Sequence, residues 1–329
     1  MKNIKLLCAA LMMTGSSLAF ADAIITDGNV SLGVDDLGQL NVGGGVADVT
    51  GITSVGMRFI DSSGNQYEST SHGCECEGWG VGIAETGESG YANNSSGTAG
   101  LTAVNFVSDA TTATAVTSTA SLQITHDFAL SSETDNLFEV VVTIENTSAT
   151  DIANLLYRRT FDWDTSPTPF NEFVSIQGAD ASTNITGAGN NGFCSSNVFS
   201  GCAVTGDILA SGPGDIGANF DFDFGALAAG EAFSFSIFYG GALGRDAALA
   251  ALGEVGAEAY SFGWSGSDAD QDGFLDGTTD LAPTYIFAFA GVGGTVIVDP
   301  TPDPVSAPAT LGLFSAVLLG LFGARRKLS

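Results

Sequence analysis

The stretch Asn219-Phe-Asp-Phe-Asp-Phe-Gly225 decides the fold class of this 329-residue chain, because aromatic and acidic side chains alternate along it without a break. Successive side chains of a β-strand point to opposite faces, so the three phenylalanines share one face and the two aspartates the other. After a tight turn at 228–231, the apolar residues of 233–237 repeat the alternation. We predict an antiparallel hairpin whose phenylalanines fill a hydrophobic core.

The same alternation recurs on both sides of this stretch. Residues 138–145 alternate apolar with polar side chains, and further strands are predicted at 260–262 and 284–289. One internal helix is predicted from Asp246, as its cap, to Leu252. Many short antiparallel strands with little helix are typical of a sandwich. We therefore predict an all-β fold, a large antiparallel two-sheet sandwich with one short helix.

The N-terminus has the three regions of a secretory signal peptide. Lys2 and Lys5 precede an apolar run from Leu6 to Met13, and small residues lead to Ala21. The apolar run is short for a membrane span. We expect residues 1–21 to be removed on export and the mature chain to begin at Asp22.

The C-terminus combines a spacer, an apolar segment and a basic end. Four prolines within 299–308 favour an extended linker. Residues 309–324 carry no charge, and as a helix they would extend about 24 Å, which is marginal for a bilayer core of about 30 Å. The basic end at 325–329 would stay on the cytoplasmic side. We predict a 22–298 β-sandwich ectodomain followed by this linker and a transmembrane sorting helix that holds the chain temporarily.

The tail also carries a family resemblance. Val305-Ser-Ala-Pro-Ala-Thr-Leu311, the Leu/Gly-rich helix and the basic end resemble the PEP-CTERM tail, which exosortase-type sorting enzymes recognise in exported Gram-negative proteins. Ser306-Ala307-Pro308 stands where the family usually has Pro-Glu-Pro, so the glutamate is absent. The resemblance implies a sorting enzyme and the membrane as partners during export and a final place at the cell surface or outside it. A plain C-terminal membrane anchor is the alternative.

The body of the chain resembles a β-rich domain found in other proteins with such tails. Three segments carry this resemblance: 156–164, 225–231 and 287–294. The domain has no assigned activity, so the resemblance implies a fold and a location and no reaction.

The segment between the two ends is strongly acidic. Residues 22–306 contain all 37 acidic residues and no lysine, and only Arg58, Arg158, Arg159 and Arg245 oppose them, a formal net charge of −33. Such a field opposes binding to nucleic acid. We expect cations, extracellular polysaccharide or other surface proteins as partners, in a salty or calcium-bearing exterior that screens the charge.

Four cysteines follow the signal peptide, and an even number in an exported chain indicates disulfides. A bond between Cys194 and Cys202 closes a short polar loop. A bond between Cys74 and Cys76 would span a single residue, so cross-pairing of the two clusters stays open. The segment from His72 to Cys76 is also a possible soft-metal site.

The most specific local motif is a candidate calcium loop. Asp268, Asp270 and Asp272 alternate before Gly273, as in the first half of an EF-hand loop. Two further residues complete the predicted site, Phe274 and Asp276. Position twelve of that register is Thr279, so the usual bidentate glutamate is missing. A solvated acidic loop without an ion is the alternative.

A second cluster lies at 158–164, where half of the ectodomain's arginines stand beside two aspartates. The predicted ligand face consists of Arg158, Asp162, Trp163 and Asp164. Arginine among aromatic residues would suit sugar binding. A partly buried ion-pair network that organises the sandwich is the alternative.

Motifs for catalysis are absent from the sequence. It has two histidines and neither a Gly-x-Ser-x-Gly elbow nor a His-Glu-x-x-His metal motif. We expect a non-enzymatic, calcium-stabilised structural or adhesive protein. A carbohydrate-binding module and, third, a sugar-active enzyme are the alternatives, and burial of Trp79, Trp163 and Trp264 would remove the aromatic basis for sugar binding.

Overall fold

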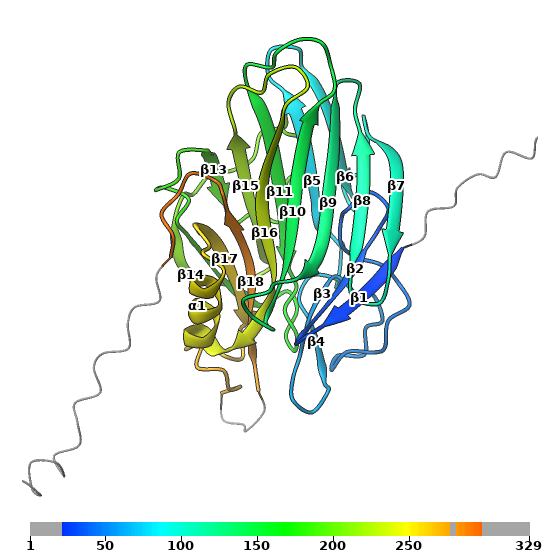
Figure 1. Cartoon of the computed structure of the whole chain (residues 1–329). Helices are drawn as coiled ribbons and strands as arrows, with labels where there is room; N and C mark the ends of the chain where they lie inside the picture. Colours follow the sequence, from blue (N-terminus) through cyan, green and yellow to red (C-terminus); the bar gives the residue numbers. More distant parts are fainter. Residues whose placement is uncertain (1–21, 277–280, 298–329) are drawn as a thin grey trace, which may run out of the picture.

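Two large antiparallel sheets pack face to face in the computed structural model, which describes residues 22–276 and 281–297 (Figure 1). The nine-stranded sheet runs, in order, β14 (Ile208–Gly214), β12 (Glu172–Gln177), β17 (Ala259–Ser265), β18 (Pro283–Ala290), β16 (Ala232–Leu243), β10 (Leu137–Asn146), β9 (Leu122–Leu130), β8 (Ala113–Ser118) and β7 (Thr102–Ser108). The five-stranded sheet runs β13 (Ile185–Gly189), β15 (Ile216–Asp223), β11 (Leu155–Trp163), β5 (Gly78–Ile83) and β6 (Glu88–Asn93). The all-β sandwich predicted from the sequence is confirmed.

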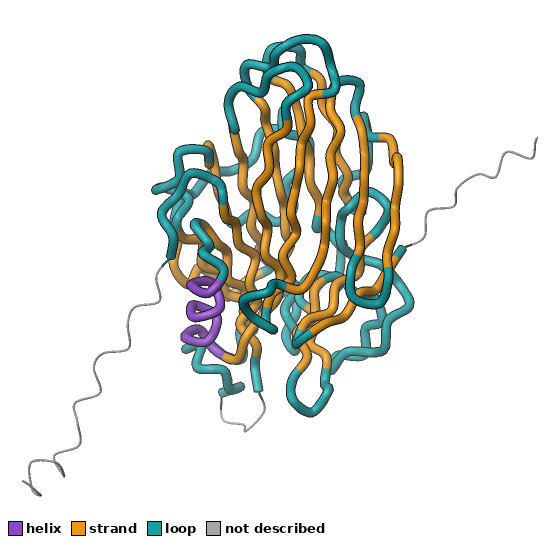
Figure 2. The backbone as a smooth tube through the Cα atoms, in the orientation of Figure 1, coloured by secondary structure: helices purple, strands orange, loops and turns teal. Residues whose placement is uncertain are grey.

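A third, smaller sheet was not predicted. It runs β1 (Ala23–Asp27), β2 (Val30–Val34), β3 (Met57–Ile60) and β4 (Gln66–Glu68), and it contacts the nine-stranded sheet through β16. The single described helix, α1 (Gly244–Glu254), packs on β16 and β18 (Figure 2). Strands therefore make up nearly all of the regular structure.

Alternation sets which residues enter the core. In β10, Phe138, Val140, Val142 and Ile144 are fully buried. The intervening Val141 is exposed, so the strand buries only one of its two faces. Side chains from both large sheets form one continuous apolar core.

The predicted hairpin at 219–237 is wrong in its pairing. β15 pairs with β11 and β13, whereas β16 pairs with β10 and β18, so the turn between them passes from one sheet to the other. The phenylalanines meet across the core, with ring centroids 4.5 Å apart for Phe224 and Phe233 and 6.0 Å apart for Phe222 and Phe235. Two facing sheets bury their apolar surfaces against each other. In a hairpin, the two strands would instead lie side by side in one sheet, with their phenylalanines on the same face.

The helix prediction is right in place and wrong in its cap. α1 begins at Gly244, its N-cap is Leu243, and no side chain caps it; Asp246 lies inside the first turn. A carboxylate there favours the helix through the positive end of the dipole. Ala248, Ala251 and Leu252 are buried against the outer face of the nine-stranded sheet.

No helix within 22–276 and 281–297 is long and apolar enough to span a membrane. The predicted signal peptide, linker and sorting helix lie outside the described residues.

Candidate functional site

A group of carboxylates gathers where one end of β11 meets the start of β12. Asp162 is the second-last residue of β11, Asp164 follows that strand, and Asp215 lies between β14 and β15. One carboxylate oxygen from each lies within 4.8 Å of the others. Glu172, the first residue of β12, is fully buried nearby and is electrostatically coupled to all three. We call Asp162, Asp164 and Asp215 the sheet-end cluster.

The environment of the sheet-end cluster opposes its negative charge. Burial, and then the charges of the neighbouring carboxylates, raise the pKa of Asp164 to about 10. Burial and Asp215 raise the pKa of Asp162 to about 7. Burial also raises the pKa of Glu172 to about 8, although backbone N–H groups of Asn171 and Ile216 donate to it. Such a site favours either a bound proton or a bound cation.

Arg158 does not serve the predicted ligand face at 158–164. It forms an ion pair with Asp221 on the neighbouring strand β15. Its Nη1 also donates to three backbone carbonyls within 195–200, at 2.8–3.0 Å. Arg158 therefore holds the 195–200 loop against the five-stranded sheet.

Arg159 and Trp163 point into the core instead. Arg159 is fully buried in an ion pair with Glu77. Trp163 is fully buried, and its Nε1 donates to Ser261 Oγ at 3.0 Å. The sequence cluster at 158–164 thus serves three separate environments: an outer loop, the core and the sheet-end cluster.

The predicted calcium loop is arranged as a compact turn. Oxygens of Asp268, Asp270 and Asp272 lie within 4.8 Å of one another. Asp268 is buried, and its carboxylate accepts the backbone N–H groups of Asp272 and Gly273. Burial raises the pKa of Asp268 to about 6.

The remaining predicted calcium ligands lie at the surface or outside the described residues. Phe274 and Asp276 are both exposed. Thr279 and Asp280, which would close the loop, lie outside the described residues. Calcium binding at this loop stays a prediction.

The cysteines are joined within their own clusters in the structure. Cys74 is linked to Cys76, with Cα atoms 5.2 Å apart, and Cys194 is linked to Cys202, with Cα atoms 5.8 Å apart. The ring nitrogens of His72 are bonded elsewhere, Nδ1 with the Asp164 carbonyl at 2.9 Å and Nε2 with a threonine hydroxyl. The soft-metal alternative at 72–76 thus loses its thiolates and its imidazole.

The three tryptophans do not form an exposed platform. Trp79 and Trp163 are fully buried between the large sheets. Trp264 is 1% exposed and stacks on Phe173 beneath α1, with ring centroids 5.5 Å apart. An aromatic surface for stacking on sugar rings is therefore not supplied by tryptophan.

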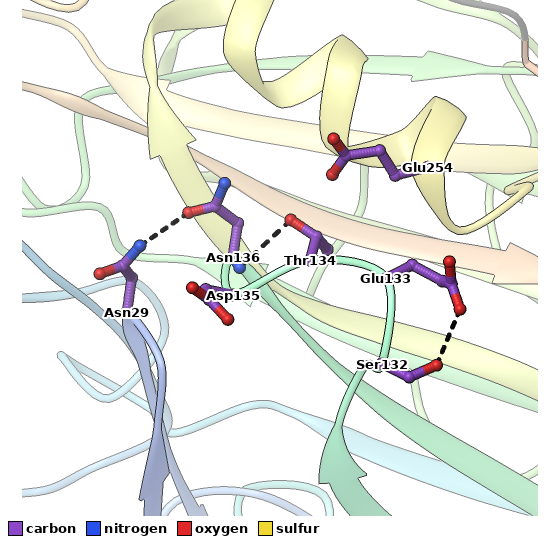
Figure 3. A pocket seen from close by; sticks show the side chains of 7 residues that line it. All are labelled: Asn29, Ser132, Glu133, Thr134, Asp135, Asn136 and Glu254. Atoms are coloured by element: carbon purple, nitrogen blue, oxygen red, sulfur yellow. Dashed lines mark hydrogen bonds between the residues drawn. The ribbon is translucent and has the colours of Figure 1, made fainter.

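A polar hollow of about 400 Å³ lies between the β1–β2 turn, the β9–β10 connection and the end of α1 (Figure 3). Its walls carry amides, hydroxyls and carboxylates from Asn29, Ser132, Glu133, Thr134, Asp135, Asn136 and Glu254. Asn29 Nδ2 donates to Asn136 Oδ1 at 3.0 Å, which fixes one wall. The hollow has the hydrogen-bonding groups that a hydroxylated neutral ligand needs, without an aromatic floor.

Sequence reasoning missed Asp215 and Glu172. Both stand in segments with no motif around them, far along the chain from Asp162. Only the antiparallel pairing of β11 with β15, and of β12 with β14, brings them to the same place.

No family model matches the chain. No curated protein matches it. Among solved structures, a candidate aldose 1-epimerase from Escherichia coli K12 is similar over 85% of this chain and 94% of that chain, at 9% sequence identity and a TM-score of 0.29. A match this distant assigns no activity to the chain.

Proposed function

We propose that this protein is an exported, non-enzymatic protein of the bacterial cell surface or extracellular matrix, with a structural or adhesive role that depends on divalent cations. The observation that supports this proposal is the distribution of charge between the interior and the surface of the protein. Of the four arginines at 22–297, Arg58, Arg158 and Arg159 are buried in ion pairs, and Arg245 alone is exposed. The outer surface therefore presents carboxylates almost without counter-charges of its own.

A surface of this kind repels a second copy of itself in dilute buffer. Salt shortens the range of that repulsion, and divalent cations can neutralise carboxylates on two molecules at once. Calcium-dependent self-association is thus the behaviour that the charge distribution supports best.

The non-enzymatic part of the proposal draws support from the two histidines. His126 is fully buried in the core, and both ring nitrogens of His72 lie at hydrogen-bond distance from other groups. Neither imidazole is placed as an exposed general base among the described residues.

Sedimentation velocity tests the proposed role. Purified protein is compared in calcium and in chelator at one fixed ionic strength, with magnesium as the control cation. We expect larger species in calcium that revert in chelator. A monomer under all conditions would contradict an adhesive role based on self-association.

Intact-mass analysis of native material tests export. We expect a chain that starts at Asp22 and lacks the basic end 325–329, as a sorting enzyme would leave it. A chain that begins at Met1 would contradict export. A chain that starts at Asp22 but still has its C-terminal tail would contradict sorting cleavage alone.

Carbohydrate binding is the second candidate, favoured by the polar hollow in Figure 3. A glycan array with the Asn136→Ala variant as control tests it. Asn136→Ala removes a side chain from the wall of the hollow, so binding that is lost in this variant supports the candidate, and binding by neither protein argues against it.

A further inference from the structure

We propose that Asp162, Asp164 and Asp215 form a divalent-cation site, suited to calcium, that ties the two large sheets together at one end of the sandwich. This site is separate from the loop at 268–276. The proposal goes beyond the proposed function, because it holds or fails whatever the protein binds outside the cell.

The spacing of the oxygens fits one ion. Calcium takes oxygen ligands at about 2.3–2.6 Å, so two ligands on opposite sides of the ion lie about 5 Å apart. In the sheet-end cluster the three carboxylate oxygens all lie within 4.8 Å of one another. One calcium ion can therefore contact all three without a large backbone movement.

Buried oxygens without partners supply an independent observation. Asp164 is fully buried, and neither of its carboxylate oxygens has a hydrogen-bond partner among the described residues; Asp162 is 1% exposed and its Oδ1 is equally unpartnered. A buried carboxylate left this way is strongly unfavourable, which is why buried carboxylates are usually paired or bound to a metal.

Within residues 22–276 and 281–297, no arginine forms an ion pair with the sheet-end cluster. The arginines that could do so are committed elsewhere: Arg58 pairs with Glu68, Arg158 with Asp221 and Arg159 with Glu77. Neither carboxylate oxygen of Asp164 is hydrogen-bonded to the other two carboxyl groups within the described residues.

The donor set points to a hard cation. All the available ligand atoms are carboxylate oxygens, which calcium and magnesium prefer and zinc does not. Cys74 Sγ lies 3.2 Å from Asp162 Oδ2, but it belongs to a disulfide and offers no thiolate. Calcium tolerates irregular ligand geometry better than magnesium does, and exposed Asp215 leaves an approach from solvent.

The location gives the ion a structural consequence. Asp162 belongs to β11 in the five-stranded sheet, and Asp215 stands on the connection from β14 of the nine-stranded sheet to β15 of the five-stranded sheet. An ion held by both residues would join the two sheets where Glu172 of β12 packs against them. We expect its binding to stabilise the whole sandwich rather than one loop.

Calorimetric titration with calcium at fixed ionic strength tests this site. The full chain carrying Asp272→Asn serves as the parent, so that the loop at 268–276 does not contribute. We expect one site in the parent and an affinity lower by about tenfold or more when Asp164→Asn or Asp215→Asn is added, because each removes a charged ligand. Asp127→Asn, an equal charge change at an exposed position of β9, should leave the affinity unchanged.

Thermal unfolding adds a readout that does not depend on counting sites. Without calcium, Asp164→Asn should melt above the parent because it removes one acid from a group of mutually repelling carboxyl groups, and in saturating calcium the order should reverse. Asp215→Asn, at an exposed position, keeps the test valid if the Asp164 variant fails to fold. A parent that binds no calcium, or variants that bind it as the parent does, would overturn the proposal.

Discussion

Arg159 Nε lies 2.6 Å from Glu77 Oε1, and both side chains are fully buried between the two large sheets. Glu77 also accepts the Leu40 N–H at 2.7 Å and the Tyr239 hydroxyl at 3.1 Å, so the carboxylate is held from three directions. The guanidinium of Arg159 lies 5.6 Å from the centre of the Tyr239 ring. This pair links β11 to residues on either side of the core.

A double-mutant cycle should show that removing either partner of the Arg159–Glu77 pair alone destabilises the fold. We expect Glu77→Gln and Arg159→Met to lower the free energy of unfolding by about 3–5 kcal/mol each, since each leaves one buried group uncompensated. The double variant should lose less than the sum of the two. Urea unfolding monitored by tryptophan fluorescence measures all four proteins, and additive losses would contradict coupling between the two residues.

Acid should destabilise the fold through His126. Burial, and then the charge of Arg159, hold the pKa of His126 well below its usual range. The folded state therefore binds fewer protons than the unfolded state below about pH 6.5, and stability falls as the pH decreases through that point, by about 1.4 kcal/mol per pH unit. At higher pH the residue is neutral in both states and contributes no slope.

The His126→Phe variant isolates this contribution, because carboxylates that titrate nearby affect both proteins alike. Its free energy of unfolding should change less than that of the natural protein between about pH 7 and pH 5. Parallel curves for the two proteins would show that His126 is not the responsible group.

Calcium should stabilise the fold through the loop at 268–276. With free calcium at about 100 times the dissociation constant, one site contributes about 2.7 kcal/mol, which raises the melting temperature by a few degrees in a domain of this size. Asp272→Ala should lower this gain by the share of one site and spare the general response to sodium chloride. Equal calcium gains in the two proteins would show that the loop is only acidic.

Peptide mapping without reduction should recover Cys194 joined to Cys202. Arg158 holds the loop between them, because its guanidinium donates to backbone carbonyls at 195–200. A reduced digest is the control. A peptide that joins Cys194 or Cys202 to Cys74 or Cys76 would show that the clusters cross-link two distant segments.

Arg158→Lys should loosen the same loop. A lysine ammonium cannot reproduce the paired contact with Asp221 together with three carbonyl bonds, because it lacks the fork of the guanidinium. We expect faster proteolysis within 195–200 and little change in the melting temperature of the core. Unchanged cleavage would mean that the disulfide alone holds the loop.

The sequence by itself determined which side of β10 and of the phenylalanine stretch in β15 faces the core. The alternation in 138–145 and 219–225 follows from the pleat of a single strand, a property of neighbouring residues that needs no knowledge of the rest of the fold. The position of α1 was also predictable from local residues, although its cap was not, since the helix begins at Gly244, two residues before the predicted cap Asp246.

Only the tertiary structure decided which strands are partners and which carboxylates meet. β15 and β16 are consecutive and carry the same pattern, yet they lie in opposite sheets, where their phenylalanine faces pack against each other across the core. Asp162 and Asp215 are 53 positions apart in the sequence, and the strand pairing of β11 with β15 brings their oxygens together. Local sequence patterns do not specify which distant strands pair, so the sheet-end cluster could be found only in the folded chain.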